Sequence, residues 1–179
     1  MACVTRHTLH PWIKKVPIYA IDLALGVGSP VWSATVSGGI SPGWLMPDGA
    51  RVGLNKDIMV PDDWIPGTDI KFYFVYSPNT VGGRGDIVLG IDYVLYPDNR
   101  YSSGLGMNPA RTVRVLTDRP SFGVVMNKTN AYVAIPGRDL RGMRQIQIAF
   151  IRAGDLAEDT DNRQHNLIKV IMEYESYQP

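Results

Sequence analysis

Histidine and cysteine, which together with acidic residues bind zinc in proteins, are few in this chain. The three histidines, His7, His10 and His165, include no pair with metal-ligand spacing on a shared element. The single cysteine, Cys3, allows neither an internal disulfide nor a cysteine-based zinc site. No serine stands in the G-x-S-x-G pattern of a hydrolase nucleophile. The sequence therefore predicts a protein that is not an enzyme and uses no metal or cofactor.

Two loop segments carry residue types that could recognise a ligand. The acidic run 158–162 alternates oxygen-bearing side chains but lacks the glycine and distal glutamate of an EF-hand, so calcium binding by this loop stays open. Arg84, Gly85 and Asp86 spell the integrin-recognition tripeptide where a loop tip is expected, although glycine-rich turns also favour these residue types. With Tyr101, they form a candidate recognition loop.

Aromatic residues offer a further binding chemistry. The four tryptophans are Trp12, Trp32, Trp44 and Trp64, and together they could form a platform for stacking sugars. In β-sandwiches, however, tryptophan more often fills the ends of the core or a subunit contact. Trp64 lies between Pro61 and Pro66–Gly67, a stiff turn that we expect to hold the indole against one end of a sheet.

Composition limits the class of protein that could carry these residues. The chain has 179 residues, is 45% hydrophobic and has a formal net charge of +1, as expected for one globular domain. That charge is too small to favour nucleic-acid binding. The longest apolar runs reach about ten residues, half of what a membrane span needs. The first fifteen residues lack the apolar stretch of a secretion signal, so synthesis in the cytoplasm is expected.

Glycine and proline recur between short apolar segments, as is typical of an all-β domain. Ile70, Phe72, Phe74 and Tyr76 alternate with other residues, which indicates a strand with one buried face. The same reasoning predicts a set of strands at 18–25, 31–37, 51–59, 69–76, 86–96, 112–116, 131–135, 145–152 and 166–175, with a further short one at 122–126.

The fold class follows from these strands and from the absence of any sustained helical periodicity. Eight to ten strands in one domain predict an antiparallel two-sheet β-sandwich, and long connections such as 97–111 favour jelly-roll crossings. The segment 86–96 is apolar on both faces, which suggests burial by a partner and hence a homo-oligomer.

The N-terminal segment differs in composition from the remainder. We expect residues 1–16 to be a flexible basic arm and 17–179 to be the jelly-roll domain. An arm of this kind would dock on a neighbouring subunit, where apolar anchors and charges could both be satisfied. The residues expected to make that contact are Arg6, Trp12, Ile13, Lys14 and Lys15.

Two stretches carry a family resemblance. Residues 61–68 read P-x-x-W-x-x-G-T and run into a strand, and Arg152, Gly154, Asp159–Thr160 and Glu173–Tyr174 follow an R-x-G … D-T … E-Y pattern. In this order and spacing, the segment 60–174 resembles small β-sandwich virion proteins of tailed phages and related viruses. The resemblance implies a jelly-roll fold, self-association as a trimer, and a place in a virus particle beside other virion proteins such as the major capsid protein. It supplies no catalytic residues.

Residues and resemblance together favour a non-enzymatic virion protein, either a capsid subunit or a decoration protein that cements the shell. The alternative is a receptor- or glycan-binding module of a tail fibre that uses Tyr101 and the Arg84–Asp86 turn. Binding of glycans would favour the second hypothesis, and adsorption to purified shells the first.

Overall fold

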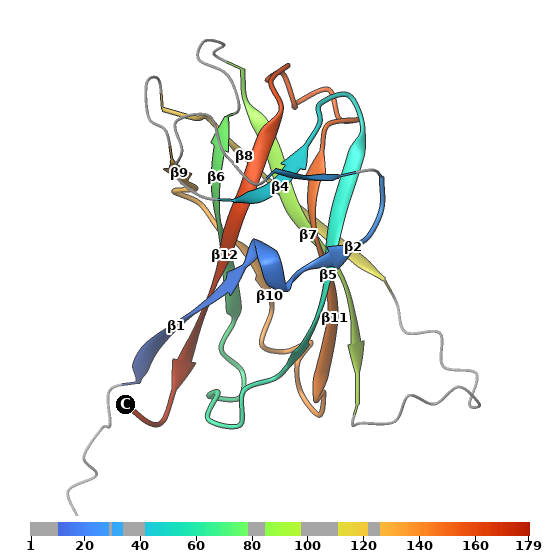
Figure 1. Cartoon of the computed structure of the whole chain (residues 1–179). Helices are drawn as coiled ribbons and strands as arrows, with labels where there is room; N and C mark the ends of the chain where they lie inside the picture. Colours follow the sequence, from blue (N-terminus) through green and yellow to red (C-terminus); the bar gives the residue numbers. More distant parts are fainter. Residues whose placement is uncertain (1–10, 29, 34–41, 79–84, 98–110, 122–125) are drawn as a thin grey trace, which may run out of the picture.

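Two antiparallel sheets pack face to face in the computed structural model, which describes residues 11–28, 30–33, 42–78, 85–97, 111–121 and 126–179 (Figure 1). Sheet A contains β1 (Trp12–Tyr19), β3 (Val31–Ser33), β4 (Gly43–Met46), β6 (Ile70–Pro78), β9 (Asn127–Lys128), β10 (Val133–Ile135) and β12 (His165–Ser176). Sheet B contains β2 (Ala24–Leu25), β5 (Arg51–Met59), β7 (Ile87–Tyr96), β8 (Thr112–Asp118) and β11 (Gln145–Ala153). The predicted fold class, an all-β jelly-roll-like sandwich, is confirmed.

The long strand β12 organises sheet A, whose order is β10-β6-β12-β4-β3. One edge of β12 pairs with β6, while its other edge pairs with β4 over 165–167 and with β1 over 169–176. A bulge between Leu167 and Lys169 lies where β12 passes from β4 to β1. Sheet B has the order β2-β5-β11-β7-β8, and all of these pairings are antiparallel.

The core lies between the sheets and is built by the predicted alternation. Ile70, Phe72, Phe74 and Tyr76 of β6 are all fully buried. Phe150 of β11 lies opposite them, with its ring centre 5.8 Å from that of Phe72 and 6.2 Å from that of Phe74. Tilted and edge-to-face aromatic pairs of this kind stabilise a core beyond the area they bury.

The predicted strand 18–25 is wrong as a single element. The chain instead ends β1 at Tyr19, forms a 3-10 turn at η1 (Ala20–Asp22) and crosses to sheet B as β2. Its apolar residues are shared between two sheets, which a one-strand interpretation could not reveal. The short strand β4 was not predicted. The other predicted strands that lie wholly within the described residues match to within about two residues, and 34–37 and 122–125 lie outside them.

Both faces of β7 are buried within the described chain, as the sequence pattern indicated. Ile87, Leu89 and Ile91 face the core, and Val88 and Asp92 on the opposite face are also buried. Asp92 accepts hydrogen bonds from Nε of Arg111 at 2.7 and 2.8 Å, so its charge is paired. A single chain therefore already buries this strand, so β7 gives no argument for a partner, and the homo-oligomer stays a prediction.

Candidate functional site

The predicted arm is partly a strand of the domain. Residues 12–19 form β1, which pairs with β12 from Trp12 opposite Ser176 to Tyr19 opposite Lys169. The predicted boundary between residues 16 and 17 is therefore wrong, since the strand starts at Trp12. Arg6 lies outside the described residues. The physical reason is that Val16 and Ile18 continue the apolar alternation of a strand to the N-terminal side of Pro17.

Four predicted arm residues occupy different environments in β1. Trp12 is 56% exposed and Ile13 is 53% exposed, although tryptophan and isoleucine are rarely left so open. Ser176, the last residue of β12, pairs with Trp12, and the next residue, Tyr177, is 61% exposed. We call the three exposed residues at this end of sheet A, Trp12, Ile13 and Tyr177, the end patch. Trp12 and Ile13 follow one another in β1, so their side chains project from opposite faces of the strand. Lys15 lies 3.3 Å from Glu173, while Lys14 turns toward the predicted Trp64 turn.

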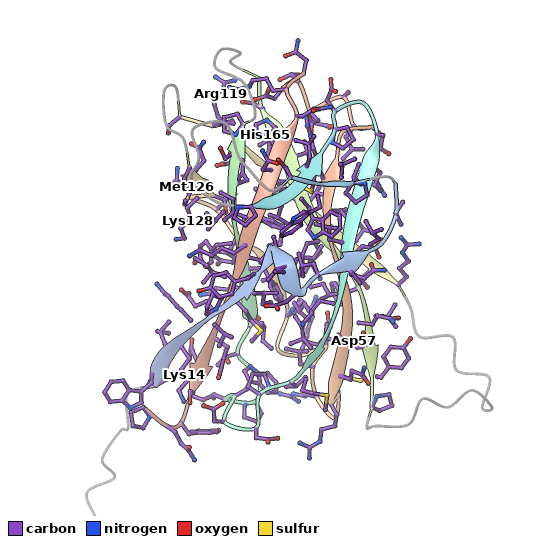
Figure 2. All side chains as sticks on the ribbon, viewed as in Figure 1. Lys14, Asp57, Arg119, Met126, Lys128 and His165 are labelled. Atoms are coloured by element: carbon purple, nitrogen blue, oxygen red, sulfur yellow. The ribbon has the colours of Figure 1, made fainter. Side chains whose placement is uncertain are left out.

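Asp63 links three elements at this end of the sandwich. Its Oδ2 accepts hydrogen bonds from Nζ of Lys14 and Oγ of Ser176, both at 2.7 Å, and its Oδ1 accepts one from the Tyr174 hydroxyl at 3.1 Å. These donors, Lys14 above all, lower the pKa of Asp63 to about 2. Figure 2 shows Lys14 at this lower end of the molecule. The contact links β1, the turn and β12.

The segment of the predicted structural turn, with Pro61, Trp64, Pro66 and Gly67, lies against the end of β12 in sheet A, where Trp64 bridges to Ser176. Trp64 is buried, and its Nε1 donates to the carbonyl oxygen of Thr68 at 3.1 Å. Gly67 has a φ of 98°, a left-handed conformation that favours glycine. The backbone N–H of Ile65 donates to the backbone carbonyl oxygen of Glu175 at 2.9 Å. The P-x-x-W-x-x-G-T motif therefore maintains the fold.

The candidate recognition loop is only partly within the described residues, because Arg84 and Tyr101 lie outside them. Gly85 packs so closely on the 154–164 loop that a Cβ there would lie 2.3 Å from the backbone nitrogen of Asp161. The backbone of Asp86 accepts hydrogen bonds from Thr160 and Asp161 at 2.8 and 3.0 Å, and its side chain pairs with Arg119. In the described part, Gly85 and Asp86 thus have structural contacts.

A buried group of charges lies at the opposite end from Asp63 and was not predicted. Arg152 is fully buried, and its guanidinium donates to the Asp159 carboxylate at 2.8 and 3.1 Å and to main-chain oxygens of Met46, Asp161 and Arg163. Arg163 pairs with Asp161. Two of the three carboxylates in the run 158–162, those of Asp159 and Asp161, are thus paired with arginine. In the sequence, the R-x-G … D-T pattern is the feature that could have indicated this group of charges. The group occupies the end of the sandwich opposite Asp63.

His165 lies within this group and is itself fully buried. Its Nε2 is 3.3 Å from Oδ2 of Asp161, but neither ring nitrogen makes an aligned hydrogen bond in the described structure. The ring also packs edge-on against Tyr76, with centres 5.4 Å apart. Burial lowers the pKa of His165, and the nearby Asp161 opposes that shift only in part. The imidazole is therefore held neutral.

The outer face of sheet A carries a surface of aromatic and basic residues. Tyr73 and Tyr132 pack edge to face, with centres 5.7 Å apart. Lys128 lies over the Tyr73 ring at 4.3 Å, and Lys71 lies over the Tyr132 ring at 5.0 Å. Toward β1, Lys169 lies 5.8 Å from the centre of Tyr19. Lysine and tyrosine at period two were visible in the sequence, but only the strand pairing brings them together.

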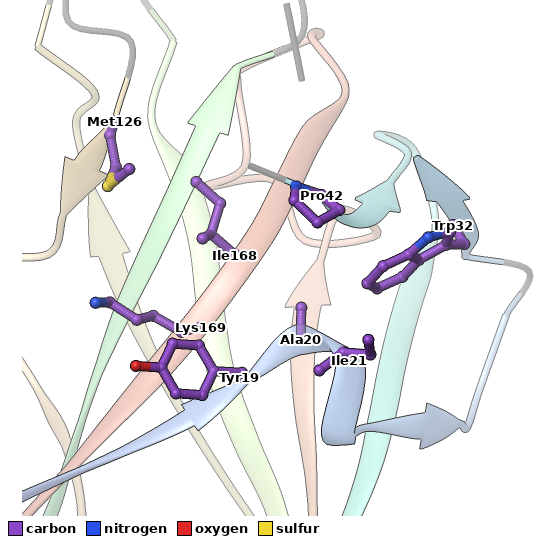
Figure 3. Close-up of a pocket in the computed structure, with 8 residues that line it drawn as sticks. All are labelled: Tyr19, Ala20, Ile21, Trp32, Pro42, Met126, Ile168 and Lys169. Atoms are coloured by element: carbon purple, nitrogen blue, oxygen red, sulfur yellow. The ribbon is translucent and has the colours of Figure 1, made fainter. Parts of the chain in front are cut away.

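A hollow of about 240 Å³ adjoins this surface, where the chain leaves β1 (Figure 3). Tyr19 and Trp32 stand on its two sides, with Ala20 and Ile21 between them. Pro42, Met126, Ile168 and Lys169 complete the lining. Its wall on one side is held by Trp44, which packs against Trp32 at 5.2 Å and donates from Nε1 to the Ala20 carbonyl at 2.9 Å.

Among the described residues, no group of three or more histidine, cysteine, aspartate or glutamate side chains is placed to hold a metal ion. Likewise, no helix in the described part of the chain is long and apolar enough to cross a membrane. The hollow and the end patch both present aromatic side chains at the surface, and such side chains often anchor a ligand or a partner.

No family model and no curated protein matches this chain. Among solved structures, a family GH115 4-O-methyl-α-glucuronidase matches with a TM-score of 0.46 and 11% identity over 89% of this chain and 17% of the other. The VP2 subviral particle of infectious bursal disease virus gives 0.42 and 13% over 92% and 33%, and a xylan-binding CBM 22 domain gives 0.40 and 15% over 88% and 89%. This chain spans only part of the first two, and likenesses so distant assign no function.

Proposed function

We propose that this protein is a non-enzymatic structural subunit of a virion, a capsid or decoration protein that self-associates in or on the shell. The end patch is the observation that carries the proposal. Trp12, Ile13 and Tyr177 expose large apolar side chains at one end of sheet A, and tryptophan and tyrosine are the residues that most often anchor protein interfaces. The resemblance of the segment 60–174 to virion proteins supplies the setting.

The structure of β1 explains why contact would use side chains rather than strand pairing. Within the described residues, β1 pairs with β12 on one side only. Pro17 removes a backbone donor, and Lys14 and Lys15 add charge, which are the features that discourage an edge strand from pairing with another chain. A neighbouring subunit, either a second copy or a major capsid protein, would therefore pack around the end of β1, where Trp12 and Ile13 project from its two faces.

The experiment compares the double variant Trp12→Ser/Ile13→Ser with Leu25→Ser, a control that changes a residue 60% exposed in sheet B. Light scattering at micromolar concentration measures mass, and electron microscopy measures adsorption to purified shells. The wild type should be an oligomer, a trimer by the resemblance. The double variant should lose at least tenfold in association while the melting temperature stays within about 2 °C, because the changed side chains are exposed. A monomeric wild type without adsorption overturns the proposal.

A second candidate is the glycan-binding module, and the aromatic hollow on sheet A favours it. Tyr19 and Trp32 line the hollow, and Lys169 lies over the Tyr19 ring. Aromatic side chains with a few polar groups are the usual lining of a small-molecule site, and they suit a sugar, which has both apolar and polar surface. This site differs from the candidate recognition loop of Arg84, Gly85, Asp86 and Tyr101. Binding of any soluble oligosaccharide that is lost in Tyr19→Ala would support it.

A further inference from the structure

The strand register places two lysines in one row across sheet A. Lys128 of β9 lies opposite Val75 of β6, Val75 lies opposite Lys169 of β12, and Lys169 lies opposite Tyr19 of β1. Directly opposed residues of antiparallel strands point to the same face, so all four face outward. Since neighbouring strands are about 4.8 Å apart, the two lysine backbones are separated by about 10 Å.

The charges of this face are not balanced. Glu173 lies 3.3 Å from Lys15 and 3.9 Å from Lys71, and one carboxylate therefore serves two lysines. Within the described residues, Lys128 and Lys169 have tyrosine rings beside them but no carboxylate partner. A ligand with negative charge would complement these two ammonium groups.

The hollow beside Lys169 limits the shape of that ligand. Its volume of about 240 Å³ lies below the roughly 300–1,000 Å³ of pockets that enclose a whole small molecule. It suits one ring of a longer chain, lying between Tyr19 and Trp32. The side of Trp32 is held by Trp44 and the Ala20 carbonyl, so little side-chain freedom would be lost on binding.

We propose that this surface binds a polysaccharide of carboxylated sugars, with one ring in the hollow and carboxylates at Lys169 and Lys128. The inference rests on the second candidate function and names its ligand class. A single-stranded nucleic acid would also offer rings and negative charge, but its binding grooves follow the backbone with many cations. Two unpaired lysines on a chain with a net charge of +1 fit the sparser charge of a uronic-acid chain.

The test is isothermal titration calorimetry of the full chain at low salt against fragments of polygalacturonate and alginate, two polyuronates with different linkages. Their methyl-esterified forms are the matched ligands, because they keep the sugar rings and lose the charge. We expect at least one polyuronate to bind tenfold or more tightly than its ester. Tyr19→Ala should weaken binding of both forms at least tenfold, and Lys128→Gln/Lys169→Gln should bring the acid down to the affinity of the ester.

Control variants and contrary results distinguish a failure of the polyuronate ligand from a failure of glycan binding itself. Tyr96→Ala and Lys56→Gln remove the same residue types from sheet B and should bind like the wild type, and circular dichroism should show all variants folded. Equal affinity for acid and ester overturns the ligand class and leaves glycan binding standing. Absence of binding to all four ligands overturns the ligand class, and glycan binding is overturned as well if neutral oligosaccharides such as xylo- and manno-oligosaccharides also fail to bind. Tighter binding of oligo(dT) than of either polyuronate overturns the proposal in favour of a nucleic-acid site.

Discussion

Asp63 is the single residue on which the end of the sandwich near β1 most depends. Three donors from β1 and β12 converge on its carboxylate, and they hold its pKa at about 2, below the ordinary 3.8. A carboxyl whose pKa falls on folding stabilises the fold fully above its ordinary value, and that stability is lost as the pH falls from 3.8 through 2.

Asp63→Asn should lower the free energy of unfolding at pH 7 by about 1 to 2 kcal/mol, because charge-assisted hydrogen bonds are lost from a pair that solvent partly screens. Urea denaturation measures the change. The matched control is Asp62→Asn, at a side chain 99% exposed, which should change stability by less than about 0.5 kcal/mol. The penalty for Asp63→Asn should shrink below pH 3; an equal penalty at pH 2 and pH 7 would show that the charge does not matter.

The fold disfavours the charged form of His165, whereas it favours the charged form of Asp63. His165 therefore affects stability at a higher pH than Asp63 does. Its pKa is lowered in the fold because burial disfavours the imidazolium. The unfolded chain binds a proton with the ordinary pKa of 6.5. Below pH 6.5 the unfolded state therefore takes up more protons than the folded state, and stability falls as the pH falls.

Between pH 7.5 and pH 5.5, the wild type should lose up to about 1.4 kcal/mol of stability, the limit set by an unfolded pKa of 6.5. His165→Gln should remove most of that loss. Urea denaturation of both proteins at the two pH values gives the measurement, and the difference between pH values counts rather than the absolute stability. A variant as pH-sensitive as the wild type would assign the dependence to other groups.

At the scale of elements, the chain just before β7 packs directly against the backbone of the 154–164 loop at Gly85. Gly85→Ala should destabilise the protein by more than about 2 kcal/mol, because its Cβ would lie 2.3 Å from main-chain atoms of Thr160 and Asp161, which cannot turn away as a side chain could. Thermal denaturation measures the effect. A neutral substitution would mean that the segment is free to move, as a recognition loop would be.

The edge strand β1 gives a second prediction at this scale. Deleting residues 2–15 removes half of β1 and the Lys14–Asp63 bond, so the melting temperature should fall by about 5 to 10 °C. A deletion of 2–11, which leaves β1 whole, is the comparison that isolates the strand. If both deletions melt at the same temperature, residues 12–15 contribute only to partners, as expected of a flexible arm.

At the scale of the whole molecule, the sheets share one core, and β12 connects the two ends. The buried Arg152 group lies at one end of β12 and the Asp63 contacts at the other. Unfolding at fixed protein concentration should therefore be one cooperative transition. Tryptophan fluorescence, with Trp64 at one end, and far-UV circular dichroism should give the same midpoint in urea. Separate midpoints would show that the ends unfold independently.

Local patterns in the sequence were enough for the sheet class and for most strand positions. The alternation of Ile70, Phe72, Phe74 and Tyr76 indicates a half-buried strand because side chains of a strand alternate between faces, whatever the strand pairs with. The turn around Trp64 is also a local feature, because proline fixes its own φ angle and glycine allows positive φ angles, whatever the rest of the chain does. These inferences needed only neighbouring residues.

Pairing between distant segments could not be predicted, and it decides the candidate sites. The strand start at Trp12 depends on β12, more than 150 residues later, and the row of Lys128, Lys169 and Tyr19 depends on three separate strand pairings. The charges of Arg152, Asp159 and Asp161 look like surface residues until the fold buries them together. Strand register and burial are properties of the assembled sheets, and only the tertiary structure determines them.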